Sequence, residues 1–282
     1  MPTIDKYAVF GHPISHSKSP RIHHLFAEQT RQHLSYVAQD VPADTFQVRV
    51  DEFFEHGGKG LNCTVPLKEL AWEYADYLSD RARTSKAVNT LALQADGRIL
   101  GENTDGLGLI NDLTRNHHFE LLDKRILILG AGGATRGILT PLMECLPSQI
   151  VITNRTVSKA DTIVSEFVDS ANLSSCDYAD LSGQQFDLII NATSASLSNQ
   201  LPPLPDTLLA ERGCCYDLAY SYEPTAFVRW GNAQQALKSL DGIGMLVEQA
   251  AEAFAIWRGI RPNTAPVIAL LEQARQTSKL PR

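Results

Sequence analysis

Short apolar runs alternate with longer segments in which apolar positions recur every three or four residues. Apolar runs of this length are typical of buried β-strands, and the longer periodic segments are typical of helices that cover a sheet. Because strands and helices alternate, the pattern predicts an α/β fold with mainly parallel sheets. The expected strands are Tyr7–Gly11, Tyr36–Gln39, Gly60–Val65, Ala87–Leu93, Arg125–Leu129, Gln149–Thr153, Phe186–Asn191 and Cys214–Leu218.

Proline marks the start of expected helices at Ser19-Pro20 and at Pro66, since its missing N–H costs little in a first turn. Nine helices are expected in all. They are Ser19–Gln32, Ala43–Glu55, a helix from Pro66 with apolar positions through Leu78, a helix through Leu113 that Asn103-Thr104-Asp105-Gly106 introduces, Ala134–Cys145, Val157–Phe167, Thr225–Leu237, Met245–Trp257 and Pro266–Gln276.

The pattern changes near Asp105 and again near Asp241, and the chain of 282 residues is long enough for two domains. We expect residues 106–241 to form a doubly wound, Rossmann-type NADP-binding domain. Residues 1–105 and 242–282 are expected to form a substrate-binding catalytic domain, with the closing helices packed back on the first part of the chain.

Composition excludes some partners. The net charge of −7 and the pI near 5.6 argue against nucleic acid or an anionic membrane as the main partner, but not against a small anion. Five scattered cysteines without a C-x-x-C pair indicate reduced thiols in a cytoplasmic protein, which we expect to be a monomer or homodimer. Cys214 and Cys215 are expected in a buried strand. No apolar run approaches a membrane span, and the N-terminus lacks signal-peptide character.

The histidines do not indicate a metal site, because His12 and His16 lack ligand spacing to any partner. We expect surface positions for His16, His23, His24, His117 and His118.

A glycine-rich turn follows the strand Arg125–Leu129 and precedes a helix. Glycines there let backbone N–H groups approach a pyrophosphate at a helix N-terminus, where the dipole favours anions. The turn consists of Gly130, Ala131, Gly132, Gly133 and Ala134, and Thr135 replaces the third glycine of the usual fingerprint. A tight turn without a ligand is the alternative interpretation.

The residues after the next strand decide which dinucleotide is expected. An NAD site usually carries an acid there to hold the ribose 2′-OH, but this chain has Asn154, Arg155 and Thr156. Because a guanidinium pairs with phosphate, the sequence predicts NADP(H) rather than NAD(H).

Lys68 and Asp105 are candidates for proton handling. Thr64 and Lys68 lie where the expected strand Gly60–Val65 passes into a helix, at the sheet edge where open α/β sheets bind ligands. A lysine near a helix N-terminus is unfavourable unless an anion or a function compensates. A solvated lysine and a helix-capping aspartate are the structural alternatives. At one cleft, the pair could give a proton to a carbonyl oxygen as hydride arrives.

Ser17 and Ser19 follow the first strand near a helix start, where hydroxyls and free N–H groups could hold a carboxylate. The alternative for Ser19 is a helix N-cap.

Nine motifs, in order along nearly the whole chain, resemble the shikimate dehydrogenase family. They are Ser-Lys-Ser-Pro at 17–20, Asn-Cys-Thr-Val-Pro-Leu-Lys at 62–68, Ala-Val-Asn-Thr at 87–90, Asn-Thr-Asp-Gly at 103–106, Gly-Ala-Gly-Gly-Ala at 130–134, Asn-Arg-Thr at 154–156, Asn-Ala-Thr-Ser at 191–194, Asp-Leu-Ala-Tyr at 217–220 and Asp-Gly-Ile-Gly-Met-Leu-Val-Glu-Gln-Ala at 241–250.

The resemblance implies an oxidoreductase that reduces 3-dehydroshikimate to shikimate with NADPH, in aromatic amino-acid biosynthesis. It also implies a catalytic pair, Lys68 and Asp105. The substrate-binding residues that it implies are Ser17, Ser19, Thr64, Lys68, Asn89, Asp105, Tyr220 and Gln249. The NADP-binding residues that it implies are Gly130 to Ala134, Asn154, Arg155, Thr156, Lys159, Thr193, Leu218, Gly242 and Met245.

Two departures from the family pattern concern the nicotinamide side. Ala195-Ser196 replaces a Ser-Gly-like turn, and Leu218 stands where methionine is frequent. Two other functions are weighed. A quinate/shikimate dehydrogenase is disfavoured by Arg155, because that branch tends to carry an acid there. A non-catalytic NADPH-binding regulator is disfavoured because Lys68 and Asp105 are both present.

Overall fold

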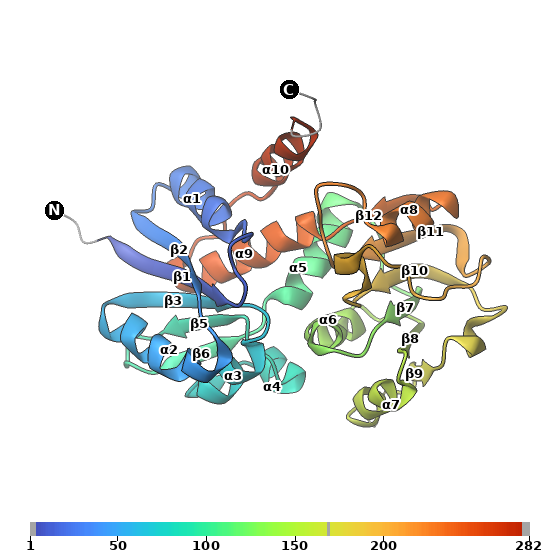
Figure 1. The fold of residues 1–282 in the computed structure, drawn as a ribbon, viewed down its shortest axis with the longest axis horizontal. Helices are drawn as coiled ribbons and strands as arrows, with labels where there is room; N and C mark the ends of the chain where they lie inside the picture. The colour runs from blue at the N-terminus through green and yellow to red at the C-terminus, as the bar shows by residue number, and fades with distance from the viewer. Residues whose placement is uncertain (1–3, 168–169, 278–282) are drawn as a thin grey trace. The chain divides into compact units, whose positions relative to one another are not determined.

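The chain folds into two compact α/β units. The computed structural model describes residues 4–167 and 170–277 (Figure 1). One unit comprises the chain up to Gly108 together with Leu246–Glu272, and the other comprises Leu109–Met245 and the residues from Gln273 onward. We call them the first and second units and describe each separately.

The first unit is built on a six-stranded sheet with the order β2-β1-β3-β5-β6-β4. β1 pairs in parallel with β2 on one side and with β3 on the other. The connections that leave β1 and β3 therefore run to opposite sides, which makes a topological switch point between these two strands. Its strands are β1 Asp5–Gly11, β2 Leu34–Asp40, β3 Gly58–Cys63, β4 Tyr77–Leu78, β5 Thr90–Leu93 and β6 Ile99–Glu102.

The prediction of a mainly parallel sheet is confirmed, with one exception among the six strands. β5 runs antiparallel to both β3 and β6, and a tight turn at Asp96-Gly97 joins β5 to β6. As a result, the beginning of β5 reaches the same sheet edge as the ends of β1 and β3. Strand β6 was not predicted, because its short run offers little periodicity.

The helices of the first unit are α1 Ser19–Thr30, the 3-10 turn η1 Ala43–Thr45, α2 Phe46–Glu55, α3 Lys68–Tyr74 and α4 Asp80–Ser85. The predicted helix from Pro66 through Leu78 was too long. It begins at Lys68 and ends at Tyr74, because Ala75 adopts an extended conformation and Leu78 lies in β4. Helix α4, with Ser79 as its N-cap, was not predicted.

Helix α9 Ile243–Arg258 contributes its residues from Leu246 onward to the first unit. Its apolar face is buried, with Val247, Ala250 and Phe254 inaccessible to solvent. Trp257 Nε1 donates to the Leu91 carbonyl over 3.0 Å, and Arg258 pairs with Asp5. Helix α10 Ala265–Thr277 follows.

The second unit is a six-stranded, entirely parallel sheet with the order β12-β11-β10-β7-β8-β9. Numbered within the unit, this is the 3-2-1-4-5-6 order of doubly wound dinucleotide-binding domains, and its switch point lies between β7 and β10. The strands are β7 Arg125–Leu129, β8 Gln149–Thr153, β9 Leu173–Cys176, β10 Phe186–Asn191, β11 Leu209–Asp217 and β12 Lys238–Leu240.

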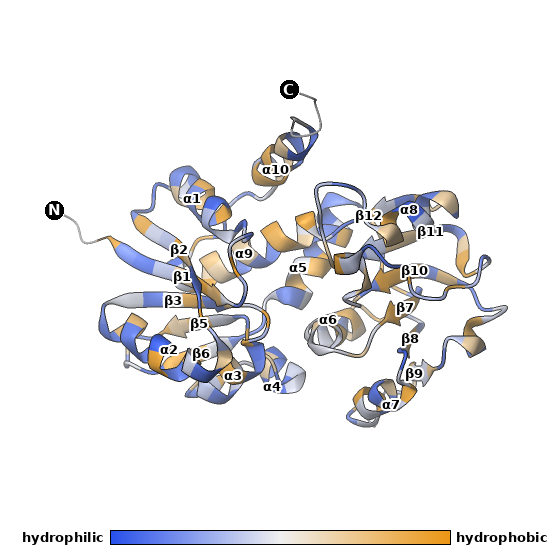
Figure 2. Ribbon diagram, viewed as in Figure 1, coloured by the Kyte–Doolittle hydropathy of each residue, from blue (hydrophilic) through white to orange (hydrophobic). Residues whose placement is uncertain are grey.

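The bounds predicted for β7, β8 and β10 are confirmed. These central strands are continuous apolar runs, and Figure 2 colours β7 and β10 as largely hydrophobic. Cys214 and Cys215 lie buried in β11, as predicted, and the five cysteines are free thiols. The edge strands β9 and β12 were not predicted.

The helices and turns of the second unit are the π-helical turn η2 Asp112–Asn116, α6 Gly133–Glu144, α7 Val157–Ser165, η3 Ala179–Leu181, η4 Ala195–Ser198 and α8 Ala226–Ala233. α5 Asp105–Asn111 contributes residues to both units. The helix predicted through Leu113 is α-helical up to Asn111 and becomes π-helical from Asp112. The buried carboxylate of Asp112 accepts a hydrogen bond from Tyr216 Oη over 2.6 Å.

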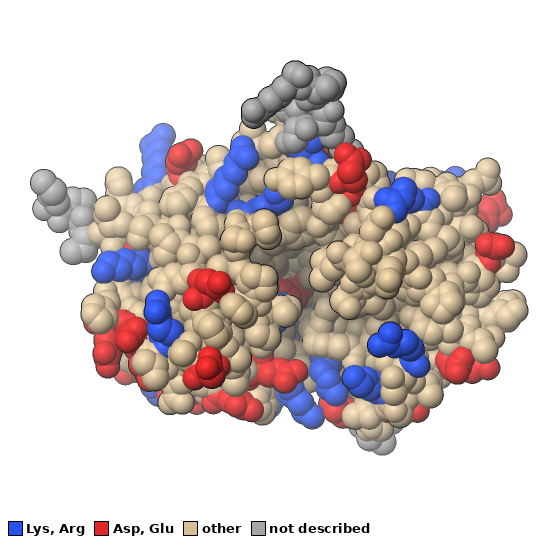
Figure 3. Space-filling model, in the orientation of Figure 1, with Lys and Arg blue, Asp and Glu red and all other residues tan. Residues whose placement is uncertain are grey.

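Surface charge is mixed: Figure 3 shows acidic and basic side chains interspersed on the face drawn. Within the described residues, no helix has the length and apolar character needed to span a membrane.

Candidate active site

The first unit gathers polar side chains beside the switch point at β1 and β3. Gly11 ends β1 where the chain after β3 passes closely: a Cβ on Gly11 would lie 2.5 Å from Thr64 Cγ2. Thr64 N donates to the Phe10 carbonyl over 2.9 Å, and Leu67 N donates to the Thr64 carbonyl. Ligands of open α/β sheets bind at such a carboxyl edge, so the fold places Thr64 where a ligand is expected.

Ser17 and Ser19 lie at the start of α1. Ser19 is the first residue of this helix rather than its N-cap, which is Lys18. Ser17 Oγ accepts from Ser19 N over 3.3 Å. The side chain of the N-cap residue, Lys18, makes no capping hydrogen bond to the backbone N–H groups of the first turn. Hydroxyls and backbone donors are thus concentrated at a helix N-terminus, which suits a carboxylate.

Lys68 and Asp105 form a close ion pair. Lys68 Nζ donates to Asp105 Oδ2 over 2.5 Å, and the side chains are 24% and 12% exposed. Lys68 is the first residue of α3, and Asp105 is the first residue of α5. The acid compensates the unfavourable position of a cation at a helix N-terminus.

An amide from the residue before β5 completes this cluster. Asn89 Nδ2 donates to Asp105 Oδ1 over 2.8 Å and lies 3.4 Å from Gln249 Oε1. Gln249 reaches the cluster from α9, and its Nε2 donates to the Leu246 carbonyl. Lys68, Asn89, Asp105 and Gln249 are therefore brought into one set of contacts.

The turn before Asp105 is held by two residues that were not predicted as site residues, Glu102 and Asn103. Asn103 Oδ1 accepts from Asp105 N over 3.1 Å, and Asn103 Nδ2 donates to the Ala87 carbonyl. Glu102 is buried, pairs with Arg81 and accepts from Asn103 N. These contacts fix the backbone that presents the Asp105 carboxylate.

In the second unit, the glycine-rich turn follows β7 at the switch point. Gly130 has φ +104°, and a Cβ there would lie 3.1 Å from the Ala192 carbonyl oxygen. A Cβ at Gly132 or Gly133 would meet no protein atom within 4 Å, so both backbones face open space. Helix α6 begins at Gly133 with Gly132 as its N-cap. This is the cradle that a pyrophosphate requires.

Thr135 occupies the position of the third glycine in the usual fingerprint and makes a hydrogen bond that glycine could not make. Its side chain is fully buried, and its Oγ1 donates to the Gly130 carbonyl over 2.8 Å. The hydroxyl thus fastens the turn to the first turn of α6.

The turn lines a cavity of about 620 Å³ that also includes Asn154, Arg155, Thr156, Lys159 and Thr193. Arg155 and Lys159 are cationic, and no carboxylate is among the described residues that line it. Cations, backbone donors and an open glycine cradle fit a phosphorylated dinucleotide.

Known proteins resemble this chain over nearly its whole length. Residues 9–91 match the family described as shikimate dehydrogenase substrate binding domain, residues 112–199 match shikimate/quinate 5-dehydrogenase, and residues 242–272 match the shikimate 5'-dehydrogenase C-terminal domain. The NADP⁺-dependent shikimate dehydrogenase of Methylococcus capsulatus is 62% identical over 98% of this chain and 99% of its own length. The chain belongs to the shikimate dehydrogenase family.

Solved structures of similar fold support this assignment. An Ael1 enzyme from Pseudomonas putida has a TM-score of 0.89 and 48% identity, covering 95% of this chain and 98% of its own. Shikimate 5-dehydrogenase from Thermus thermophilus, solved with NADP(H) and shikimate, has a TM-score of 0.85 and 32% identity, covering 96% of this chain and 100% of its own.

The family residues on the predicted nicotinamide side lie together at the end of β11. A Cβ on Gly242 would lie 2.3 Å from the Leu218 carbonyl oxygen, so only glycine fits this approach. Met245 N donates to Tyr216 Oη over 3.3 Å, and Leu218 and Met245 pack against the core of the second unit. Tyr220 also belongs to the second unit, where burial raises its pKa.

A buried carboxylate holds the loop that departs from the family pattern. Asp217 Oδ2 accepts from Ser196 Oγ over 2.5 Å and from Thr225 Oγ1 over 2.6 Å, and Asp217 Oδ1 accepts from Asn191 Nδ2. Burial raises the pKa of Asp217, and these hydrogen bonds oppose the rise. Asn191 Oδ1 in turn accepts from Thr193 Oγ1 over 2.7 Å, so the network positions Thr193.

Several cavity residues were missed because their sequence signals are weak. Tyr178 follows β9, and the segment Gln200 to Pro203 lines the same cavity from the loop after η4. No glycine fingerprint or charge pattern marks either segment.

One surface prediction was wrong. His23 is 1% exposed and stacks on Tyr36 with ring centroids 4.1 Å apart. It lies on the buried face of α1 with Ile22 and Phe26, because that face packs on the sheet. Burial lowers the pKa of His23 to about 3.

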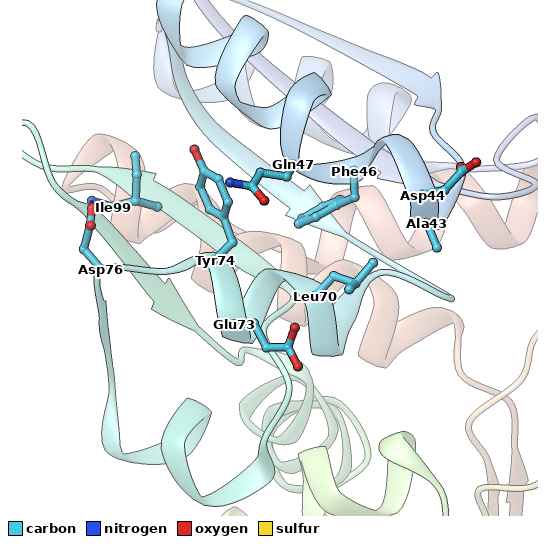
Figure 4. A pocket seen from close by; sticks show the side chains of 9 residues that line it. All are labelled: Ala43, Asp44, Phe46, Gln47, Leu70, Glu73, Tyr74, Asp76 and Ile99. Atoms are coloured by element: carbon cyan, nitrogen blue, oxygen red, sulfur yellow. Dashed lines mark hydrogen bonds between the residues drawn. The ribbon is translucent and has the colours of Figure 1, made fainter.

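A second cavity, of about 500 Å³, lies between α2 and α3 of the first unit (Figure 4). Phe46, Leu70 and Tyr74 line it, together with the carboxylates of Glu73 and Asp76. None of the predicted site residues contributes to it.

Proposed function

We propose that this chain catalyses the reversible, NADPH-dependent reduction of 3-dehydroshikimate to shikimate. The observation that carries the proposal is the Lys68–Asp105 ion pair, which contacts Asn89 at the carboxyl edge of the first sheet. It joins a proton donor to neutral hydrogen-bonding groups, as reduction of a polyhydroxylated ketone requires.

We propose that one group of residues binds the substrate carboxylate and that another binds the ring hydroxyls and the carbonyl. Ser17 and Ser19 hold the carboxylate at the N-terminus of α1, with Tyr220 as a further partner. Thr64, Asn89, Asp105 and Gln249 hold the ring hydroxyls and the carbonyl. Neutral donors and acceptors of this kind fix the orientation of a small polar ligand.

Lys68 is the proposed proton donor. When bound, NADPH supplies the hydride that forms the new C–H bond at the carbonyl carbon. The carbonyl π electrons move to oxygen, which takes a proton from Lys68 Nζ and becomes the hydroxyl. Asp105 holds the ammonium in place and balances its charge, and the lysine regains its proton from solvent.

The cofactor residues follow from the cavity of the second unit. Gly130, Ala131, Gly132, Gly133 and Ala134 would hold the pyrophosphate through backbone N–H groups. Asn154, Arg155, Thr156 and Lys159 would surround the 2′-phosphate. Thr193, Leu218, Gly242 and Met245 would line the nicotinamide side.

We further propose that residues 1–105 and 242–282 are the substrate-binding domain and residues 106–241 the NADP-binding domain. The free thiols support a cytoplasmic location. The enzyme is further proposed to act as a monomer or homodimer.

The test is an absorbance assay of reduced nicotinamide, with shikimate and quinate each paired with NADP⁺ and NAD⁺. The proposal expects the highest kcat/KM for shikimate with NADP⁺. Efficient oxidation of quinate with NAD⁺ would favour the quinate/shikimate branch. Binding of NADPH without any turnover would favour a regulator.

A further inference from the structure

A chain of buried hydrogen bonds crosses the sheet of the first unit behind the proposed site. Tyr36 in β2 is 1% exposed, Asn62 in β3 is 7% exposed, and Thr90 in β5 is inaccessible to solvent. Tyr36 Oη donates to Asn62 Oδ1 over 2.6 Å, and Asn62 Nδ2 donates to Thr90 Oγ1 over 3.0 Å. Thr90 Oγ1 donates to Asn89 Oδ1 over 2.9 Å, which links the chain to the proposed site.

Backbone groups fix the direction of every bond in this chain. Asn62 Nδ2 also donates to the Asn89 carbonyl, which can only accept, so the Asn62 amide cannot be reversed. Asn89 Oδ1 accepts from Thr104 N, which can only donate, so the Asn89 amide is fixed too. Asn89 must therefore present Nδ2 to Asp105 Oδ1.

The other end of the chain is the buried hydroxyl of Tyr36. Since the Tyr36 hydrogen is given to Asn62, the Tyr36 oxygen is left to accept. Burial raises the pKa of Tyr36 well above its usual value, and a side-chain hydrogen bond with Ser19 opposes the rise.

We propose that Tyr36 is a positioning residue: the backbone sets the direction of these bonds, and the Tyr36 hydroxyl, by donating to Asn62 Oδ1, holds the Asn62, Thr90 and Asn89 side chains where Asn89 can contact Asp105. This inference rests on the proposed function. His23, stacked on its ring, holds the aromatic plane in place.

The first variant is Tyr36→Phe, which keeps the ring and its stacking but removes the hydroxyl. The matched control is Tyr7→Phe: Tyr7 is opposite Tyr36 in the sheet register and is equally buried, but its hydroxyl contacts Arg258. We expect Tyr36→Phe to lower kcat roughly tenfold and to shift the pH profile of kcat, and Tyr7→Phe to change kcat less than about twofold.

Variants of Thr90 distinguish a positioning role from direct contact with the substrate, because Thr90 is inaccessible to solvent and to a ligand. Thr90→Val should lower kcat as Tyr36→Phe does, and Thr90→Ser should restore it. The double variant Tyr36→Phe/Thr90→Val should lose little more than either single variant, since both interrupt one chain.

Wild-type turnover is measured first, so failure of the proposed function appears as an inactive wild type. With an active wild type, three outcomes would overturn the proposal. They are an unchanged kcat in Tyr36→Phe with only KM raised, a Thr90→Val enzyme with normal kcat, and additive losses in the double variant. Thermal unfolding of each variant shows whether it is folded at the assay temperature.

Discussion

Lys68 and Asp105, which stand 37 positions apart in the sequence, are joined by a hydrogen bond of 2.5 Å from Nζ to Oδ2. The pair exists because α3 and α5 both begin at the carboxyl edge of the first sheet. Neither residue is therefore a solvated surface group, and each has the other as its principal partner.

Replacing Lys68 with alanine is expected to lower kcat by about 10²- to 10⁴-fold, with a much smaller change in KM for shikimate. The reason is that Lys68 gives up its proton only in the transition state, so its loss lowers kcat. The other substrate-binding residues remain in the variant and keep KM nearly unchanged. Steady-state kinetics measure both constants. Lys59→Ala, an exposed lysine on β3, is the control. An unchanged kcat would remove Lys68 from the mechanism.

Replacing Arg155 with alanine is expected to raise KM for NADPH by about 10- to 100-fold and to leave KM for NADH within a few-fold, because only NADPH carries the 2′-phosphate. The comparison of the two cofactors is its own control. Equal losses with both would contradict the phosphate role.

Thr135→Val removes the hydroxyl that donates to the Gly130 carbonyl and keeps the side-chain volume. We expect a loss of about 1–2 kcal/mol in the free energy of unfolding and a higher KM for NADPH. Urea unfolding and kinetics test this. Thr135→Ser keeps the hydroxyl and should remain close to the wild type in both measurements.

Asp217→Asn weakens the acceptor that holds Ser196 and Thr225. An amide has one oxygen in place of two, so we expect a loss of roughly 2–3 kcal/mol in unfolding free energy. The KM for NADPH should rise while the KM for shikimate stays unchanged, because Thr193 lies in the same network. A rise confined to the shikimate KM would contradict this assignment.

His23 should make the folded state sensitive to acid. Its pKa falls from 6.5 in the unfolded chain to about 3 in the folded one, so the unfolded chain binds more protons between these values. Stability is therefore full above pH 6.5 and declines as the pH falls toward 3. At 1.36 kcal/mol for each tenfold change in proton affinity, the loss is about 4 to 5 kcal/mol.

Unfolding by urea at a series of pH values measures this decline. His23→Phe should flatten the decline, whereas His24→Phe, a change at an exposed position of the same helix, should leave it as in the wild type. Identical pH profiles for all three proteins would show that His23 is not the group responsible.

The sequence was most informative where a strand is buried on both faces. The apolar runs of β7, β8 and β10 gave the correct bounds because both faces of a parallel sheet exclude polar residues. β6, β9 and β12 escaped prediction because strands of three or four residues are too short to show a period.

The prediction of site residues was limited because the identity of one residue does not show which side chains lie beside it in space. Serine, lysine and aspartate near strand ends were visible in the sequence as candidates. Tyr36, Asn62 and Thr90 were not, because each is a single polar position in a short strand and their hydrogen bonds join different strands. His23 was misplaced for a similar reason, since a histidine on a helix gives no sign of the aromatic side chains that cover it.

The antiparallel direction of β5 has a practical consequence for engineering. Because β5 starts at the site with Thr90 and runs away from it, the β5–β6 turn at Asp96-Gly97 lies at the opposite edge of the sheet. Gly97 has φ +84°, and nothing lies within 4 Å of a Cβ built on it. This turn is where a reporter peptide or an affinity tag can be inserted into the domain while the ligand-facing edge remains undisturbed.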